Sequence, residues 1–201
     1  MTTTISRLYD NYADAQTAVR GLEAAGVPHS DISIVANNSD GTLGTNKKDR
    51  DGDGVDDRVE GAETGAGIGA GLGGAAGLLA GLGLLAIPGL GPVVAAGWLA
   101  ATAVGAVAGA ATGGLVGALT EAGVSKDDAG RYAEGVRRGG TLVTAKVADT
   151  DKARLDAILH KSSVNLQDRS AAWQKSGWEG YDPGSQPYDA DSVRKERSLY
   201  R

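Results

Sequence analysis

The sequence predicts an α+β fold: a small ferredoxin-like α/β sandwich, split by an antiparallel glycine-rich helical hairpin and followed by an extended C-terminal tail. Three observations predict it. Short apolar strands alternate with amphipathic helical stretches in the order β-α-β and, after a long insertion, α-β-α-β. The insertion, residues 61–122, is built almost entirely from Gly, Ala, Leu and Val. Residues 169–201 are polar, with scattered Pro and Gly.

Composition limits the classes of function. The formal net charge of −5 makes nucleic acid an improbable partner. Cys is absent, which excludes disulfides, thiolate metal sites and Cys nucleophiles. No apolar segment follows a basic N-terminus, so we expect no signal peptide and a cytoplasmic head domain.

Residues 1–37 are expected to form the first half of the sandwich. Ile5–Tyr9 is predicted as a strand, and Asn11 is a suitable N-cap for the helix that follows it. Gly26 and Pro28 end that helix, and Ile32–Ala36 is predicted as a buried strand. The helix places one apolar face inward, made of Ala15, Ala18, Val19, Leu22 and Ala25.

Residues 123–168 are expected to form the second half. Ser125 can cap a helix that Gly139-Gly140 ends, and Thr141–Val147 is the clearest strand of the chain. A further helix follows from Asp149 or Thr150, and Val164–Leu166 is predicted as a short last strand. The three basic residues Arg131, Arg137 and Arg138 are interpreted as a solvated helix end, with an anion site as the minor alternative.

Two segments resemble a known family. Residues 123–143 read GVSKDDAGRYAEGVRRGGTLV, and the segment from Leu8 to Val27 shows a similar pattern. Together with their surroundings, roughly 4–37 and 123–167, they resemble the heat-induced general stress protein domain (YflT-like). The resemblance implies a stress-linked bacterial protein with no catalytic residues to transfer.

The most specific motif lies in the linker, residues 38–60. Residues 49–60 read DRDGDGVDDRVE, which matches the twelve-residue EF-hand calcium loop, with Gly54 at the sharp turn. The predicted ligands are Asp49, Asp51, Asp53, the carbonyl of Val55, Asp57 and Glu60. The alternative is a solvated acidic linker. We expect weak binding of Ca²⁺, on the order of 10⁻⁴ to 10⁻³ M, which orders the loop and fixes the hairpin relative to the head domain.

The insertion repeats glycine at every fourth position, a spacing that lets helix backbones approach closely. Its arms are predicted as helices over about 61–87 and 92–121. The repeat consists of Gly61, Gly65, Gly69, Gly73, Gly77, Gly81, Gly97, Gly105, Gly109, Gly113 and Gly117. Each four-residue step rotates the stripe by roughly 40°, so one partner helix cannot cover it. We therefore expect a homo-oligomer.

Two surroundings remain open for this assembly. Both arms exceed the roughly 20 residues that cross a bilayer, which favours the cell membrane. Gly and Ala contribute little to insertion, so a soluble fibre, tube or closed oligomer in the cytoplasm is the alternative.

The tail allows two interpretations. Its composition is typical of disorder, while three aromatic residues, Trp173, Trp178 and Tyr181, could form a docking strip. Residues 192–200 could then form a short helix. No Ser/His/Asp arrangement, phosphate loop or small-molecule site is evident, so we expect no enzyme.

Overall fold

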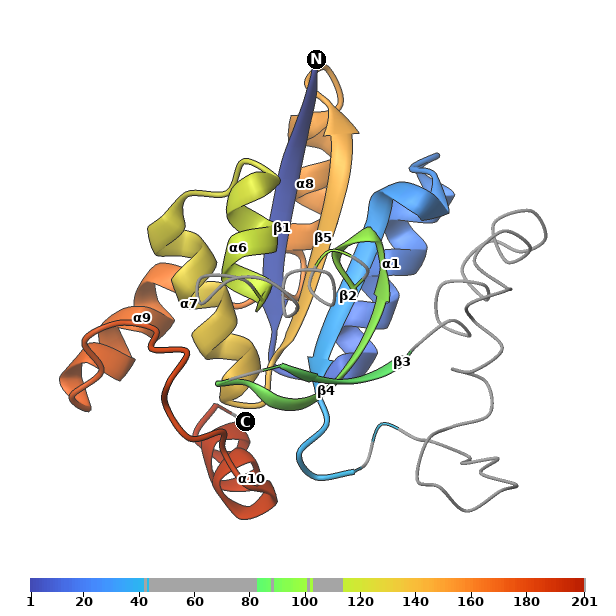
Figure 1. Cartoon of the computed structure of the whole chain (residues 1–201). Helices are drawn as coiled ribbons and strands as arrows, with labels where there is room; N and C mark the ends of the chain where they lie inside the picture. Colours follow the sequence, from blue (N-terminus) through green and yellow to red (C-terminus); the bar gives the residue numbers. More distant parts are fainter. Residues whose placement is uncertain (42, 44–82, 88, 101, 103–113, 201) are drawn as a thin grey trace, which may run out of the picture.

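The computed structural model describes residues 1–41, 43, 83–87, 89–100, 102 and 114–200 (Figure 1). In chain order its elements are β1 (Thr2–Tyr9), α1 (Tyr12–Ala24), η1 (His29–Asp31), β2 (Ile32–Asn37), β3 (Gly83–Ile87), β4 (Gly91–Gly97), α6 (Gly114–Glu121), α7 (Lys126–Arg137), β5 (Thr141–Ala148), α8 (Lys152–His160), α9 (Leu166–Lys175) and α10 (Ala190–Ser198). The prediction of a mixed α+β fold is confirmed.

Five strands form one sheet in the order β1-β5-β2-β4-β3, and every neighbouring pair is antiparallel. Ile5 lies opposite Ala145, and Val143 lies opposite Ile34. Because β5 is antiparallel to both β1 and β2, these two strands run parallel with β5 between them. The unit β1-α1-β2 is thus a split β-α-β crossover.

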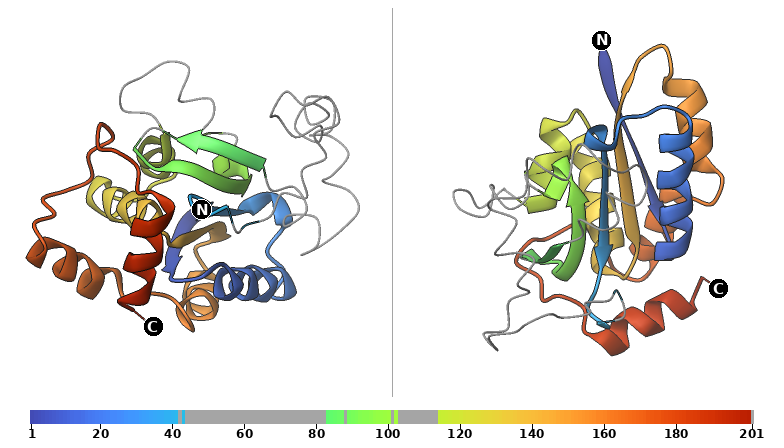
Figure 2. Two further views of the ribbon diagram at one scale, coloured as in Figure 1. Left: turned by 90° about the horizontal axis from the view of Figure 1, so that it is seen from below. Right: turned by 90° about the vertical axis from the view of Figure 1, so that its right-hand side faces the viewer.

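Helices cover the sheet on both faces (Figure 2). All six residues of β2 are buried, which requires apolar cover on each side. Helices α1 and α8 close one face over Leu22, Val143 and Leu159. Helices α6, α7 and α9 close the other over Leu8, Leu142 and Trp173. Neighbouring strand residues such as Leu142 and Val143 serve opposite faces because side chains alternate along a strand. The sheet is therefore the middle one of three layers.

The elements predicted on either side of the insertion are largely confirmed. Asn11 caps α1 by accepting a hydrogen bond of 2.9 Å from the Asp14 amide. Ser125 caps α7 in the same way through Asp128. Gly26 adopts a φ of 92°, the left-handed conformation that ends a helix.

The predicted helical hairpin is wrong for residues 83–97. Residues 83–87 and 91–97, assigned to its two arms, are strands β3 and β4, with Ile87 opposite Gly91 across a tight turn. Val93 and Val94 favour a strand, and the glycines of the turn accommodate positive φ. The spacing of small residues masked these local signals. Gly97 is the last residue of β4, where a Cβ would lie 2.2 Å from the Ile32 carbonyl oxygen.

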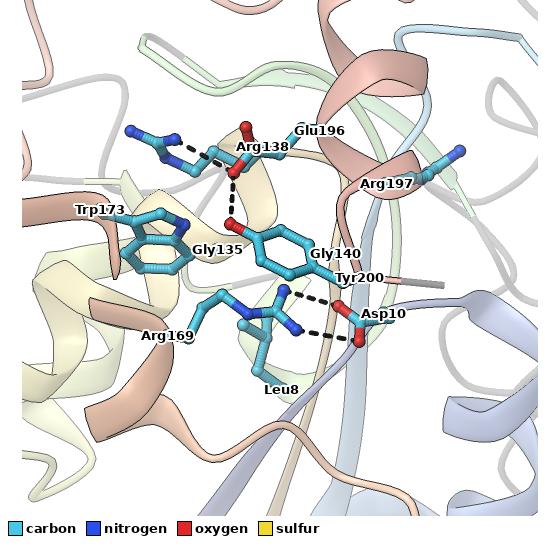
Figure 3. Close-up of a pocket in the computed structure, with 10 residues that line it drawn as sticks. All are labelled: Leu8, Asp10, Gly135, Arg138, Gly140, Arg169, Trp173, Glu196, Arg197 and Tyr200. Carbon is cyan, nitrogen blue, oxygen red and sulfur yellow. Dashed lines mark hydrogen bonds and ion pairs between the residues drawn. The ribbon is translucent and has the colours of Figure 1, made fainter. Parts of the chain in front are cut away.

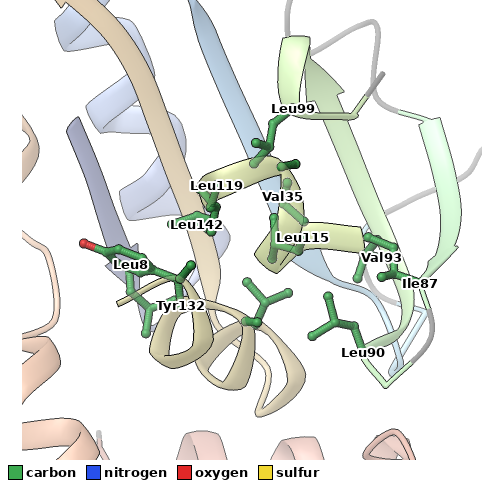
Figure 4. Close-up of a cluster of buried hydrophobic side chains, with 14 of the residues drawn as sticks. Leu8, Val35, Ile87, Leu90, Val93, Leu99, Leu115, Leu119, Tyr132 and Leu142 are labelled. Carbon is green, nitrogen blue, oxygen red and sulfur yellow. The ribbon is translucent and has the colours of Figure 1, made fainter. Parts of the chain in front are cut away.

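Residues 114–121, including Gly117, are helical as predicted, but α6 packs inside the head domain instead of forming the end of a long arm. Its Leu115 and Leu119 lie in the core beside Leu99 and Val93 (Figure 4). The other glycines of the four-residue repeat lie outside the described residues: Gly61, Gly65, Gly69, Gly73, Gly77, Gly81, Gly105, Gly109 and Gly113. Within the described ranges, no helix combines the length and hydropathy needed to cross a membrane.

Two predictions at the C-terminal end are also corrected. Val164–Leu166 is not a strand: the Val164 amide donates one hydrogen bond of 2.8 Å to the Leu8 carbonyl, and α9 then starts after its cap Asn165. The tail is not an extended, disordered segment. Trp173 and Val193 are buried in it, and α10 lies against the end of the sheet opposite the N-terminus (Figure 1).

Candidate functional site: a strap held by arginines

The last turns of α7 carry a buried ionic cluster. Residues 134, 137 and 138 share one side of the helix because side chains three and four positions apart are neighbours. The carboxylate of Glu134, whose side chain is 1% exposed, accepts hydrogen bonds of 2.8 and 2.9 Å from Arg137 and one of 2.5 Å from Arg138. Burial opposes the charge of Arg138, but Glu134, together with Tyr188 and Glu196, outweighs burial and raises the pKa of Arg138. Glu134 thus fixes two guanidinium groups side by side.

Residues 181–200, called the strap here, lie across these guanidinium groups. The ring of Tyr188 packs with its centroid 4.7 Å from the Arg137 Cζ atom and 5.5 Å from that of Arg138. Arg137 also donates a hydrogen bond of 3.2 Å to the carbonyl of Gln186. Cation–π contacts of this kind contribute about 0.5–2 kcal/mol each, depending on solvent exposure.

A second set of contacts joins the end of the strap to β1 and α9 (Figure 3). Arg138 contacts Glu196 at 3.1 Å, and the hydroxyl of Tyr200 donates to the same carboxylate oxygen at 3.1 Å. The ring of Tyr200 covers Arg169 at 3.4 Å, and Arg169 forms a bidentate ion pair of 2.7 and 3.0 Å with Asp10. These side chains line a small pocket of about 10 Å³, roughly the space of one water molecule. Its charged groups are paired with one another, so it offers no evident reactive group.

Helix α10 is held by a third arginine. Arg197 donates hydrogen bonds of 2.9 Å to the carbonyl of Gly139 and of 2.5 Å to the carboxylate of Asp40, whose side chain is 4% exposed. Val193, on the same helix, is fully buried. The start of α10 is capped by Asp189, which accepts from the Ser192 amide.

Three glycines of the head domain let the strap approach closely. Gly89 and Gly91, at the β3–β4 turn, and Gly139, after α7, have φ values of 76°, 82° and 104°. A Cβ at Gly89 would lie 2.8 Å from the Pro183 carbonyl oxygen, and one at Gly139 would lie 2.7 Å from Val193. We call α7, the β3–β4 turn, Gly139 and Asp40 the cradle. Its surface fits this strap and leaves no room for added side chains.

The predicted docking residues are brought together, but against their own chain. Trp173 and Trp178 meet edge to face with ring centroids 5.6 Å apart, and Arg138 lies 5.1 Å from the Trp173 ring. Tyr181 packs on Gly130 and on Gly89, and burial raises its pKa to about 12. Trp178 and Tyr181 also line a groove of about 320 Å³ beside the start of α7.

Some residues of this site cannot be recognised from the sequence. The interpretation of Arg137 and Arg138 as solvated is wrong, because both side chains are largely buried. No sequence motif marks Glu134, Tyr188 or Glu196. The only local signal was the arginine pair, because the strap partners lie roughly 50–60 positions away.

The predicted calcium ligands, Asp49, Asp51, Asp53, Val55, Asp57 and Glu60, lie outside the described residues. In the part of the chain that is described, no group of three His, Asp or Glu side chains could hold a metal ion. Compared with protein-family models, curated proteins and solved structures, the chain gives no match.

Proposed function

We propose that the chain is a non-enzymatic, stress-related bacterial protein of the YflT-like type that associates with itself through its glycine-rich insertion, which a Ca²⁺-binding loop orders relative to the head domain. The observation that supports this most is the place where the insertion leaves the sheet. Val35 of β2 and Gly83 of β3 both lie opposite Ala95 of β4. Two strands separated by one neighbour are roughly 10 Å apart. Because β2 and β3 are both antiparallel to β4, they run parallel to each other, and we propose that residues 44–82, which connect them, project from this edge of the sheet as an arm.

The calcium motif stands at the base of this proposed arm. It begins twelve positions after Asn37, the last residue of β2, and ends where the glycine repeat starts. Six oxygen ligands around Ca²⁺ would fix the direction in which the arm leaves the head domain. Ca²⁺ is thus proposed as a structural ion that makes association more favourable.

The arm is proposed to associate at the cell membrane. Since 83–97 belong to the sheet, the proposed contact segment shortens to residues 61–82. The alternative is a soluble assembly of the same arms in the cytoplasm.

We also propose that the head domain is related to the ferredoxin-like fold. The split β1-α1-β2 unit with β5 between its strands supports it, as does the Val164 hydrogen bond on the outer side of β1. The β3–β4 hairpin and α6 would be additions to that framework.

Sedimentation velocity with Ca²⁺ or EDTA tests the proposal. We expect Ca²⁺ to increase the mass of the wild-type assembly and to leave Glu60→Gln unchanged, because a bidentate ligand is lost. Asp56→Asn is the matched control: it removes one charge at position 8 of the loop, which is not a ligand, and should respond like wild type. Equal masses with Ca²⁺ and EDTA for all three proteins would overturn the proposal.

The location is tested separately by flotation with phosphatidylcholine–phosphatidylglycerol vesicles, followed by alkaline carbonate washing. We expect the protein to remain with the vesicles. Recovery of assembled protein in the unbound fraction would replace the membrane with the soluble assembly.

A further inference from the structure

The strap is attached through a hinge with few constraints. Gly177 and Gly180, between α9 and the strap, have φ values of 91° and 152°, and a Cβ at either position would meet no atom within 4 Å. The Trp178 amide still closes the end of α9 by donating to the Trp173 carbonyl at 3.0 Å. The chain can therefore change direction at Gly180 without disturbing α9.

The strap makes local contacts with itself and distant contacts with the cradle. Asp182 accepts from the Gly184 amide, Asp189 from the Ser192 amide, and Tyr200 donates to Glu196, all within four residues. Its anchors on the head domain are of another kind: Tyr188 on two arginines, Val193 on Gly139, and Arg197 on Asp40. These local contacts can persist when the strap leaves the cradle, and a cradle cannot distinguish the strap of its own chain from that of another copy.

We propose that the cradle is an interaction surface for a second copy of this chain, which docks its strap there while its own cradle receives the first strap. Such exchange creates no new interface and keeps every anchor, with the change confined to the hinge. Apart from Val193, which is fully buried, the anchors are charged and aromatic groups. They can therefore release into water more readily than a segment of the aliphatic core.

Exchange depends on concentration. A tethered strap sees its own cradle at an effective concentration in the millimolar range, so the closed monomer dominates in dilute solution. Exchange becomes competitive where copies are gathered. It needs neither Ca²⁺ nor residues 44–82, so it stands independently of the proposed function, although an associating arm would promote it.

A charge-swap experiment in EDTA tests the proposal. Asp40→Arg and Arg197→Asp each break the same ion pair and loosen the strap. In an exchanged pair of the two full-length variants, the new carboxylate on the strap of the Arg197→Asp copy lies beside the new guanidinium in the cradle of the Asp40→Arg copy. The strap of the Asp40→Arg copy still carries Arg197, and it binds the unchanged Asp40 of the Arg197→Asp copy. We expect tagged Asp40→Arg to recover about ten times more untagged Arg197→Asp than untagged Asp40→Arg.

Equal recovery of both partners would overturn exchange, because association through the arm does not discriminate between them. The double variant Asp40→Arg/Arg197→Asp, which restores the pair within one chain, confirms by circular dichroism that position 40 tolerates the change. An independent measurement uses wild-type protein. In a concentrated mixture of differently isotope-labelled copies, we expect NOEs between Val193 methyl protons of one copy and Gly139 of the other; their absence at all concentrations would contradict the proposal.

Discussion

The two faces of the sheet are closed by different means. On the α1/α8 face the contacts are aliphatic, with Val19, Leu22 and Leu159 fully buried. A buried tyrosine hydroxyl, that of Tyr9, donates to the Leu159 carbonyl at 2.7 Å. On the α7 face an aliphatic layer is also present, but its outer rim is closed by the strap through arginines, carboxylates and aromatic rings.

The two faces of the sheet therefore differ in how easily they open and close again. Aliphatic burial is lost only when the layers separate, whereas the charged groups and rings of the strap regain hydrogen bonds to water and contacts with ions when they open. The α1/α8 face should thus open only on global unfolding, and the strap should open by itself. Four changes test this comparison, in order of decreasing effect.

Leu22→Ala should have the largest effect. It removes a fully buried side chain on α1, which costs about 2–5 kcal/mol in the free energy of unfolding through lost burial and a cavity. Urea denaturation followed by circular dichroism measures it. The neighbouring exposed position provides a control, since Arg20→Ala should change stability by about 0.5 kcal/mol or less. A loss for Leu22→Ala no greater than this would mean that the α1 face does not dominate stability.

Glu134→Gln should lower the free energy of unfolding by about 2–3 kcal/mol. This is less than the cost of breaking a complete buried ion pair, because Arg138 remains paired with Glu196. Two guanidinium groups lose their shared carboxylate, so the strap should loosen first. Hydrogen exchange of residues 181–200, compared with urea denaturation, separates the two effects. Asp151→Asn, which breaks the exposed pair with Arg154, is the control and should cost about 0–1 kcal/mol. Unchanged strap protection in Glu134→Gln would contradict the assignment of the cluster.

Tyr188→Ala should weaken strap docking by about 1–2 kcal/mol, because two arginines lose a ring. Tyr188→Phe keeps the ring and should behave nearly like wild type. The midpoint of strap release, followed by tryptophan fluorescence, measures both. If Phe and Ala have the same effect, the hydroxyl and not the ring holds the strap.

Alkaline pH should release the strap gradually. Burial raises the pKa of Tyr181 from 10.0 to about 12 when the strap is docked. Below pH 10 the hydroxyl is neutral in both states and docking is fully stable. Between pH 10 and about 12 the free strap loses the proton and the docked strap keeps it, so docking weakens as pH rises. Absorbance of tyrosinate near 295 nm follows this ionisation, and Tyr181→Phe should lose its contribution to the pH dependence. An unchanged slope in Tyr181→Phe would assign that dependence to other tyrosines.

Local sequence signals predicted the α1 face well. The signals for α1 all lie within one helix and its two ends: the cap Asn11, the apolar face that includes Leu22, and Gly26. Because these signals are local, α1 and the strands β1 and β2 beside it could be recognised. The same holds for Ser125, α7 and β5. These elements need no knowledge of distant contacts.

The strap and the β3–β4 hairpin could not be recognised in the same way. A stretch rich in Gly and Ala fits both a close-packed helix and an edge strand, and the choice depends on β2, which Val94 meets through Ala36 far along the chain. The strap is polar, and its order comes from partners such as Arg137 and Asp40. Composition indicates disorder in such a segment even when distant charges hold it.

Native-state hydrogen exchange on the full chain measures the central comparison most directly. Amides of α1 and β5 should exchange only with the free energy of global unfolding, while amides of α10 should exchange through a smaller opening whose free energy falls further with added salt. If α10 and α1 open with the same free energy at every salt concentration, the strap and the α1 face belong to one cooperative unit, which contradicts separate opening of the strap.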